Sequence, residues 1–245
     1  MTFQKFIVTT RPEAKDNAGY SSRCFSIMNV PVTSLKPNKD LDDVEIRNFK
    51  PDIVIFTSAY GTQIALERFP DIFFMKPEAV AIGEKTAEAL VAAGLRCRLP
   101  EIRTSEGVIE IIRNNEWQNK RIILFTSSKS NRVIEDFLVD HGYCFLTVRL
   151  YDAVPIDNAA FIQRISSPSC FGVIITSSHE AKVVHAALSD GRLNAEILRN
   201  LKFFAIGAPT AKTMLELNLK VSAPPGESNI QELLTKIDHI YCGKK

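Results

Sequence analysis

Four hydroxyl side chains recur in two similar stretches of the sequence. Ser58 and Ser177 each follow an apolar run that ends in Thr-Ser, whereas Thr86 and Thr210 each follow an apolar run that ends in Ile-Gly. A helical pattern comes next in every case, so we expect all four hydroxyls at helix N-termini. Backbone N–H groups are unpaired there and the helix dipole favours negative charge. One such residue is explained by helix capping alone, but four of them in two copies predict a cleft that accepts anions.

Three further side chains are candidates for contact with an anionic ligand or for acid catalysis. Arg11 and Arg149 lie beside the ends of predicted strands, where they either pair with carboxylates or stay solvated. Tyr151 ends an alternating strand, 145–151, on the same face as Arg149. A phenol there could face a cleft between two domains as an acid or hydrogen-bond donor, and packing at the domain junction is an equally good interpretation.

The sequence motifs do not indicate a metal site, a nucleotide-binding site or a catalytic nucleophile. The cysteines are Cys24, Cys97, Cys144, Cys170 and Cys242. They never form C-x-x-C, so we expect free thiols rather than a disulfide framework or a zinc site. The histidines are His141, His179, His185 and His239, and none has a metal-ligand partner at useful spacing. G-x-S-x-G, G-x-G-x-x-G and P-loop motifs are absent. We therefore expect no cofactor and no metal.

Composition limits the class of partner. The chain has 245 residues, of which 45% are hydrophobic, enough for one large core or two ordinary ones. The chain has 30 Lys and Arg residues and 28 Asp and Glu residues. The net charge therefore does not indicate binding to nucleic acid or to a membrane surface. No apolar run approaches about 18 residues, and the N-terminus shows no signal-peptide apolar region. We expect a cytoplasmic monomer that binds a small molecule.

The two stretches indicate an internal duplication. They run over 53–95 and 173–219, with an offset of 119 residues between Ser58 and Ser177 and of 124 between Thr86 and Thr210. Each half alternates apolar runs with helical patterns, which predicts five strands per half in doubly wound, flavodoxin-like parallel sheets of the α/β class. Ligands of such sheets bind at the carboxyl ends of the strands.

Local signals mark the expected ends of the elements. Gly94 and Gly142 should end helices, and Thr104 should start one. Capping-box spacings start two more helices, at Ser177 with Glu180 and at Ser228 with Gln231. A helix over 13–23 and a strand over 27–32 are also expected. Polar residues over 33–43 and after Pro155 indicate two linkers.

An ordered set of motifs resembles the uroporphyrinogen-III synthase family over nearly the whole chain. The motifs are TTRP, FTSAYG, AIGEKTAEAL, TSEGVIEII, VRLYDAVP, VIITSS, FFAIGAPTAKTM and LKVSAPPGESNIQELL. The resemblance implies two α/β domains, one from 1–33 with 156–245 and one from 38–150, joined by paired linker strands at 34–37 and 151–155. It also implies an enzyme of tetrapyrrole biosynthesis. Such an enzyme cyclises hydroxymethylbilane, a linear tetrapyrrole with many carboxylates, with loss of water and inversion of ring D, and needs no cofactor or metal.

By this resemblance, the four hydroxyl residues match positions that line the substrate cleft, and Tyr151 matches a tyrosine proposed to assist departure of the hydroxyl group. The chain departs from the family over 127–132, where members more often show an Arg-Gly or Cys-Gly turn. This departure favours an alternative, a non-catalytic module of the same fold that senses tetrapyrroles or anions. A two-domain binding protein of the periplasmic type is a second alternative, and the N-terminal sequence argues against it.

Overall fold

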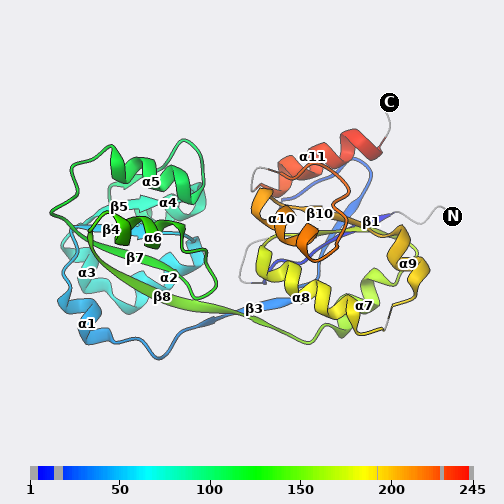
Figure 1. Ribbon diagram of the computed structural model, residues 1–245, viewed down its shortest axis with the longest axis horizontal. Coiled ribbons are helices and arrows are strands. Elements are labelled where there is room, and N and C mark those ends of the chain that lie inside the picture. The colour runs from blue at the N-terminus through cyan, green and yellow to red at the C-terminus, as the bar shows by residue number, and fades with distance from the viewer. Residues whose placement is uncertain (1–4, 14–18, 192, 227–228, 243–245) are drawn as a thin grey trace. The chain divides into compact units, whose positions relative to one another are not determined.

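The computed structural model describes residues 5–13, 19–191, 193–226 and 229–242, and the chain in it divides into two compact units (Figure 1). Unit 1 comprises Met1–Leu35 and Val154–Lys245, and unit 2 comprises Lys36–Ala153. The chain passes between the units within β3 (Thr33–Pro37) and β8 (Cys144–Pro155), which are neighbouring strands of one sheet. The polar stretch at 33–43 therefore begins with a strand. The domain boundaries expected from the sequence stay a prediction.

Unit 2 is built on a six-stranded sheet in the order β3-β8-β7-β4-β5-β6. The remaining strands are β4 (Ile53–Phe56), β5 (Glu78–Ala81), β6 (Cys97–Arg98) and β7 (Arg121–Ser127). The pairs β8-β7, β7-β4, β4-β5 and β5-β6 are parallel. The apolar runs form central strands because both faces of the sheet are covered, as parallel sheets require.

Helices cover the two faces of this sheet. They are α1 (Asp43–Asn48), α2 (Ala59–Arg68), α3 (Pro70–Phe74), α4 (Glu84–Ala92), α5 (Ser105–Arg113) and α6 (Val133–Asp140). One core joins α5 and α6 to side chains such as Ile55 and Ile122. Phe56 of β4 and Phe125 of β7 stack with 4.7 Å between their ring centroids, and Phe73 of α3 packs on both rings. The ends of the strands are thus held between two packed layers.

Unit 1 is built on a parallel sheet in the order β10-β9-β1-β2. Its strands are β1 (Phe6–Thr9), β2 (Ser26–Asn29), β9 (Cys170–Ile175) and β10 (Lys202–Ala205). Its helices are α7 (Ala159–Ile165), α8 (Ser178–Ser189), α9 (Ala195–Asn200), α10 (Ala208–Glu216) and α11 (Ile230–Tyr241). Val173 and Ile175 of β9 pack with α7, α8 and α10, whereas Ile174 packs with α11. Alternate side chains of β9 therefore lie on opposite faces of the sheet.

The two units repeat one strand order. The order β5-β4-β7-β8 in unit 2 matches β10-β9-β1-β2 in unit 1, and Val221 bridges to β10 where unit 2 has β6. Gly94 after α4 and Asn218 after α10 both have positive φ, 81° and 58°. This correspondence is what a duplication predicts, although the duplication itself stays a prediction. The parallel α/β class is confirmed.

Several local expectations are wrong. Gly19–Arg23 is not helical, and residues 14–18 of the expected helix lie outside the described residues. The expected strand at 27–32 ends at Asn29. Among the described residues, the first half of the sequence has six strands rather than five, because 33–37 pairs with β8. The second half has four, because Val221 forms only an isolated bridge to β10. Ser228 lies outside the described residues, and Asn229 is the N-cap of α11.

The expectation of free thiols fails for two cysteines. Cys24 and Cys242 form a disulfide, whereas Cys97, Cys144 and Cys170 are free. The two partners are 218 residues apart in sequence, and only the packing of α11 beside the segment before β2 brings them together. In the part of the chain that the structure describes, no helix is long and apolar enough to cross a membrane.

Candidate functional site

Tyr151 lies at the carboxyl end of the unit 2 sheet with its hydroxyl fixed by another side chain. It is 6% exposed, and its Oη donates a hydrogen bond to Ser58 Oγ at 2.9 Å. The β7–β8 register shifts between Thr126 and Ser127, so that Tyr151 rather than Leu150 pairs with Ser127. Burial raises the pKa of Tyr151, an effect that interaction with Ser58 and Ser127 partly offsets. The phenol is therefore neutral and keeps its proton at neutral pH.

Ser58 is the N-cap of α2, as the sequence predicts. Its Oγ accepts a hydrogen bond from Gly61 N at 3.0 Å and a second from Tyr151. A hydroxyl has two acceptor sites and one donor, so the Ser58 proton remains to be donated to a third group. An oxygen of an anion is a suitable acceptor for it. Gly61 also makes room for the pair, because a Cβ there would lie 3.0 Å from Ser58 Oγ.

Further hydroxyls gather where β7 ends. Thr57 Oγ1 donates to Thr126 Oγ1 at 3.0 Å, and Thr126 Oγ1 donates to Ser130 Oγ at 2.7 Å. Ser130 Oγ in turn donates to the Ser127 carbonyl at 3.1 Å. The loop in which the sequence departs from the family pattern is thus tied to the strand ends next to Tyr151. Sequence reasoning missed this network, although the run of serines at 127–130 was visible.

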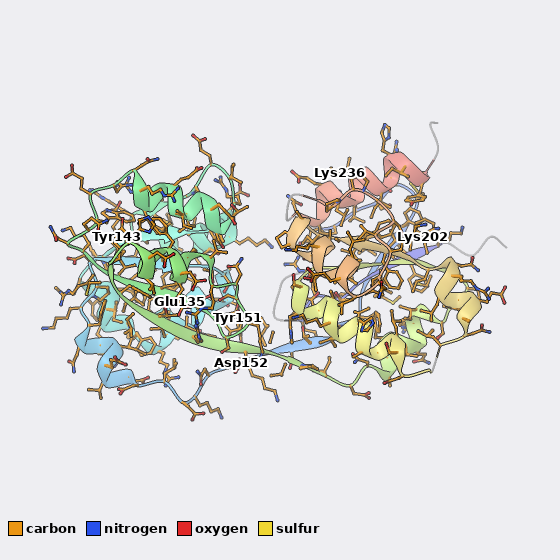
Figure 2. The ribbon with its side chains drawn as sticks, in the orientation of Figure 1. Glu135, Tyr143, Tyr151, Asp152, Lys202 and Lys236 are labelled. Atoms are coloured by element: carbon orange, nitrogen blue, oxygen red, sulfur yellow. A yellow bond between two sulfur atoms is a disulfide. The ribbon has the colours of Figure 1, made fainter. Side chains whose placement is uncertain are left out.

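The two candidate arginines are already engaged within their own units. Arg149 Nη2 donates to both carboxylate oxygens of Glu135, at 3.2 and 2.9 Å. Figure 2 shows Glu135 and Tyr151 on the same unit. Arg11 Nη1 donates to Tyr20 Oη, and its buried Nε has no hydrogen-bond partner among the described residues. Arg149 is therefore paired with a carboxylate, whereas Arg11 contacts a hydroxyl group.

The second pair of helix starts uses glycine caps. Gly83 precedes α4 and Gly207 precedes α10, and neither helix has a side-chain hydrogen bond at its N-cap. Thr86 and Thr210 lie in the first turns of these helices and are each 4% exposed. Neither helix therefore has an N-cap side chain that accepts from its first N–H groups, which suits an external acceptor, although Pro209 in the first turn of α10 contributes no N–H.

In unit 1, Ser177 and Thr210 stand on neighbouring helix starts. Ser177 Oγ accepts from Glu180 N at 3.1 Å, which confirms it as the N-cap of α8. Ser178 Oγ donates to the Pro209 carbonyl at 3.2 Å and so joins the first turns of α8 and α10. In unit 2, α2 packs against α4 in the same way.

Glu180 is a buried carboxylate that sequence reasoning treated only as part of a capping box. It is 2% exposed and accepts hydrogen bonds from Thr10 Oγ1 at 2.6 Å and from the Thr176 N–H at 3.1 Å. The side chain therefore ties the ends of β1 and β9 to α8 rather than capping Ser177. The matching residue of unit 2, by the 119-residue offset, is Gly61, where the room is used by Tyr151. The phenol that is hydrogen-bonded to Ser58 thus belongs to unit 2.

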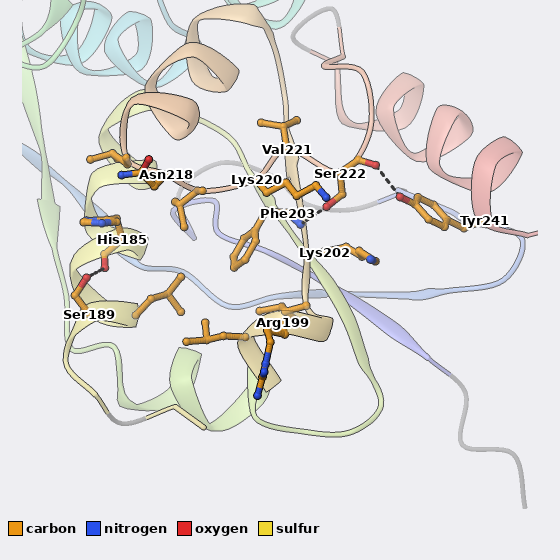
Figure 3. A pocket seen from close by; sticks show the side chains of 15 residues that line it. His185, Ser189, Arg199, Lys202, Phe203, Asn218, Lys220, Val221, Ser222 and Tyr241 are labelled. Carbon is orange, nitrogen blue, oxygen red and sulfur yellow. Dashed lines mark hydrogen bonds between the residues drawn. The ribbon is translucent and has the colours of Figure 1, made fainter. Parts of the chain in front are cut away.

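The pocket of unit 1 in Figure 3 lies away from these residues. It has a volume of about 610 Å³ and contains Lys202 and Phe203 at the amino end of β10 together with His185, Ser222 and Tyr241. Tyr241 Oη donates to the Ser222 carbonyl at 2.7 Å. None of the predicted site residues lines it, because those residues stand at the carboxyl ends of the strands.

Comparisons with known proteins agree on one family. The family model "Uroporphyrinogen-III synthase HemD" matches residues 18–235. A mutant uroporphyrinogen III synthase from Thermus thermophilus has a TM-score of 0.61 and 17% identity, with 96% of this chain and 98% of that chain covered. A uroporphyrinogen-III synthetase from Helicobacter pylori has a TM-score of 0.66 and 17% identity, with coverage of 96% and 99%. No curated protein matches the sequence. At this identity the two structures show the fold alone.

Proposed function

Because the chain belongs to the uroporphyrinogen-III synthase family, a family of cyclising lyases of tetrapyrrole biosynthesis, we propose that Tyr151 and the hydroxyl-bearing helix starts carry out its reaction. The substrate is hydroxymethylbilane, which closes to uroporphyrinogen III with loss of water and inversion of ring D. The single observation that carries the proposal is the hydrogen bond from Tyr151 to Ser58 at the start of α2.

Helix starts hold the substrate's carboxylates in this proposal. Each unit offers two of them, at Ser58 and Thr86 in unit 2 and at Ser177 and Thr210 in unit 1. The N–H groups at these helix starts can donate to carboxylate oxygens, and so can the hydroxyl proton of Ser58. Binding of this kind does not need an excess of basic residues. A net charge of only +2 agrees with this mode of binding.

Arg149 and Arg11 have minor proposed roles in binding the substrate's carboxylates. Arg149 contacts a substrate carboxylate only if it exchanges or shares Glu135, which now accepts two hydrogen bonds from it. Arg11 has a buried Nε without a partner among the described residues, and this N–H is the donor that it would offer to a carboxylate.

Tyr151 assists the departure of hydroxide from the bilane. Hydroxide is a poor leaving group, and a proton or a strong hydrogen bond lowers the barrier to its loss. The raised pKa keeps the phenol protonated, and its one proton, which Tyr151 now donates to Ser58 Oγ, passes to a hydrogen bond with the leaving hydroxyl when the substrate binds. Binding folds the flexible chain of the substrate so that ring D reacts through its substituted position, giving a spiro intermediate.

Separation of the product isomers tests the function. Freshly generated hydroxymethylbilane is mixed with the protein, and the products are resolved by chromatography. The type III isomer is expected to form at a rate proportional to the amount of protein added. Type I alone, as formed spontaneously without protein, would refute the enzyme. The monomeric state and the cytoplasmic location are not tested by the fold and stay predictions, checked by light scattering and by cell fractionation.

A further inference from the structure

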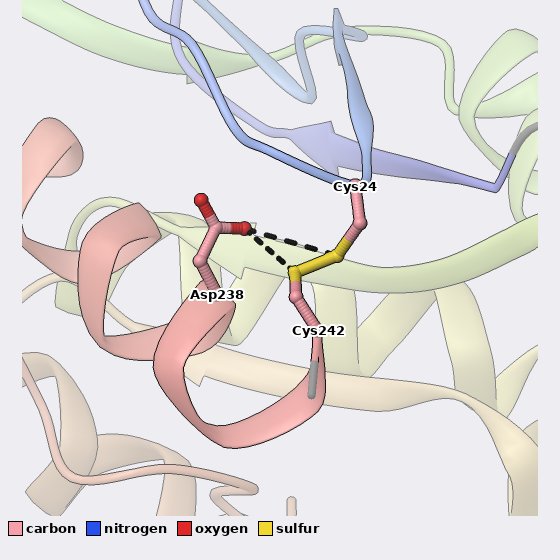
Figure 4. Close-up of side chains that lie close together, drawn as sticks. All are labelled: Cys24, Asp238 and Cys242. Carbon is pink, nitrogen blue, oxygen red and sulfur yellow. Dashed lines mark hydrogen bonds between the residues drawn. A yellow bond between two sulfur atoms is a disulfide. The ribbon is translucent and has the colours of Figure 1, made fainter. Parts of the chain in front are cut away.

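Two sulfurs and a buried carboxylate converge at the amino end of the unit 1 sheet (Figure 4). Cys24 lies just before β2, and Asp238 and Cys242 lie at the end of α11. Asp238 Oδ1 is 3.1 Å from Cys242 Sγ and 4.0 Å from Cys24 Sγ. One ligand atom from each of the three residues lies within 4.8 Å of the others. Ser177 and Thr210 stand at the opposite, carboxyl end of the strands, so this cluster is not part of the proposed reaction site.

The electrostatics of the cluster favour a cation. Asp238 is 6% exposed and lies in the last turn of α11, where the helix dipole is negative. Among the residues that the structure describes, no Lys, Arg or His forms an ion pair with it. A buried carboxylate at the negative end of a helix is unfavourable without positive charge nearby.

The carboxylate is held in place by the segment that carries Cys24. Ser22 Oγ donates to Asp238 Oδ1 at 2.5 Å, and the Arg23 N–H donates to Oδ2 at 2.8 Å. Hydrogen bonds of this kind orient carboxylates that ligate metals. The three potential ligand groups are therefore fixed by two segments that are already packed together.

We propose that reduction of the Cys24–Cys242 disulfide opens a binding site for a thiophilic divalent cation of the zinc type, with Asp238 as the third ligand. A thiol reductant supplies two electrons and is itself oxidised to a disulfide, while the S–S bond breaks and each sulfur takes up a proton. Binding of the cation then releases both protons, because the ligands are thiolates. Zinc takes sulfur ligands at about 2.3 Å in a tetrahedral site, and a water molecule supplies the fourth ligand.

The cation would fasten the same elements as the disulfide. α11 packs on the sheet through Ile230, Leu233, Leu234 and Ile237, in a cluster that also contains Phe25. A metal bridge between α11 and the segment before β2 preserves this packing under reducing conditions. The proposal does not depend on the catalytic function.

Cobalt absorption tests the site directly. The parent is the full chain with Cys97, Cys144 and Cys170 replaced by Ser, reduced with a phosphine and titrated with Co²⁺. A thiolate-to-cobalt charge-transfer band is expected, together with its loss when Zn²⁺ displaces the cobalt. Cys24→Ser, Cys242→Ser and Asp238→Asn should each lose or weaken the band. Glu232→Gln removes an exposed acid from the same helix and should leave it unchanged.

The parent also provides a readout that does not depend on the folding of any variant. Zn²⁺ should raise the melting temperature of the reduced parent and not that of the oxidised one, since only the native reduced form binds it. Absence of the band and of this shift would overturn the site. A full band with unchanged affinity in folded Asp238→Asn would overturn the role of the carboxylate, and binding by the oxidised protein would overturn its dependence on reduction.

Discussion

At the scale of single residues, the hydrogen bond from Tyr151 to Ser58 supports the proposed catalytic role of Tyr151. Ser58 Oγ receives two hydrogen bonds, from Tyr151 and Gly61, and so keeps one donor for a ligand. Tyr60 packs edge-on against Tyr151 at 5.0 Å between ring centroids and helps to fix the ring. These contacts fix the orientation of the Tyr151 ring and therefore the position of its hydroxyl group.

Tyr151→Phe should keep the fold and the substrate affinity and lower turnover by roughly one to two orders of magnitude, because the proton donor for the leaving hydroxyl is lost. The rate of type III formation and the melting temperature are measured together. Tyr143→Phe removes a phenol that lies just before β8 in the same unit and serves as the control. Unchanged melting with an unchanged rate would remove Tyr151 from the mechanism.

The raised pKa of Tyr151 predicts an alkaline loss of stability. Its native pKa lies above the unfolded value of about 10, so the contribution of the protonated phenol is complete below about pH 10. That contribution is lost as the pH rises through the native pKa. In urea unfolding, the wild type should lose stability relative to Tyr151→Phe above about pH 10. Parallel pH profiles of the two proteins would contradict the assignment.

The sequence identifies Tyr151 as a candidate but cannot predict its partner. Regular alternation places Tyr151 with Arg149 on one face of β8, yet the register shift at Thr126 and Ser127 buries the phenol beside Ser58. Glu135 as the partner of Arg149 also depends on how α6 packs. Both contacts join residues that are distant in sequence, so no local spacing encodes them.

At the scale of elements, the strand-to-helix turns serve both folding and function. Ser58→Ala should lose the N-cap of α2, at a cost of about 0.5–2 kcal/mol, and should also slow turnover because Tyr151 loses its acceptor. Thr104→Ala is a matched control, since Thr104 caps α5 in the same unit by accepting from Gly107 N. Chemical unfolding and type III rates are compared. Equal loss of rate in both variants would reduce Ser58 to a structural cap.

Helix starts are predictable where the cap and its acceptor pattern are local. Ser58, Thr104 and Ser177 all cap the helices that their sequences predict. Asn229 caps α11, and Ser228, the cap that the sequence predicts, lies outside the described residues. The polar composition of Thr33–Pro37 predicts a linker and gives no sign of the pairing with β8, which only the family resemblance implies.

At the scale of the whole molecule, the repeated apolar runs of the sequence predict buried parallel strands but not the order of the strands in each sheet. The apolar runs before Ser58 and Ser177 become the central strands β4 and β9, as buried runs in parallel sheets should. The Cys24–Cys242 disulfide could not be predicted, since nothing in the spacing of the cysteines indicates which pairs the folded chain brings together.

Catalysis should not depend on metal ions or thiols. None of the seven proposed site residues is a cysteine, and Cys24, Asp238 and Cys242 lie at the amino end of the strands of unit 1. Turnover should therefore survive a chelator and replacement of all five cysteines by Ser, apart from losses of stability. Type III rates are measured at a temperature where each protein is folded. Loss of turnover by folded protein on chelation would contradict this separation.

The most direct test of the whole account follows ring D through the reaction. Hydroxymethylbilane with an isotope-labelled terminal ring is converted by the protein, and the product is read by NMR. We expect a product in which the labelled ring is turned and the other rings are not, formed at a rate proportional to the concentration of the protein. A product in which the labelled ring keeps its original orientation, formed at the spontaneous rate, would contradict it.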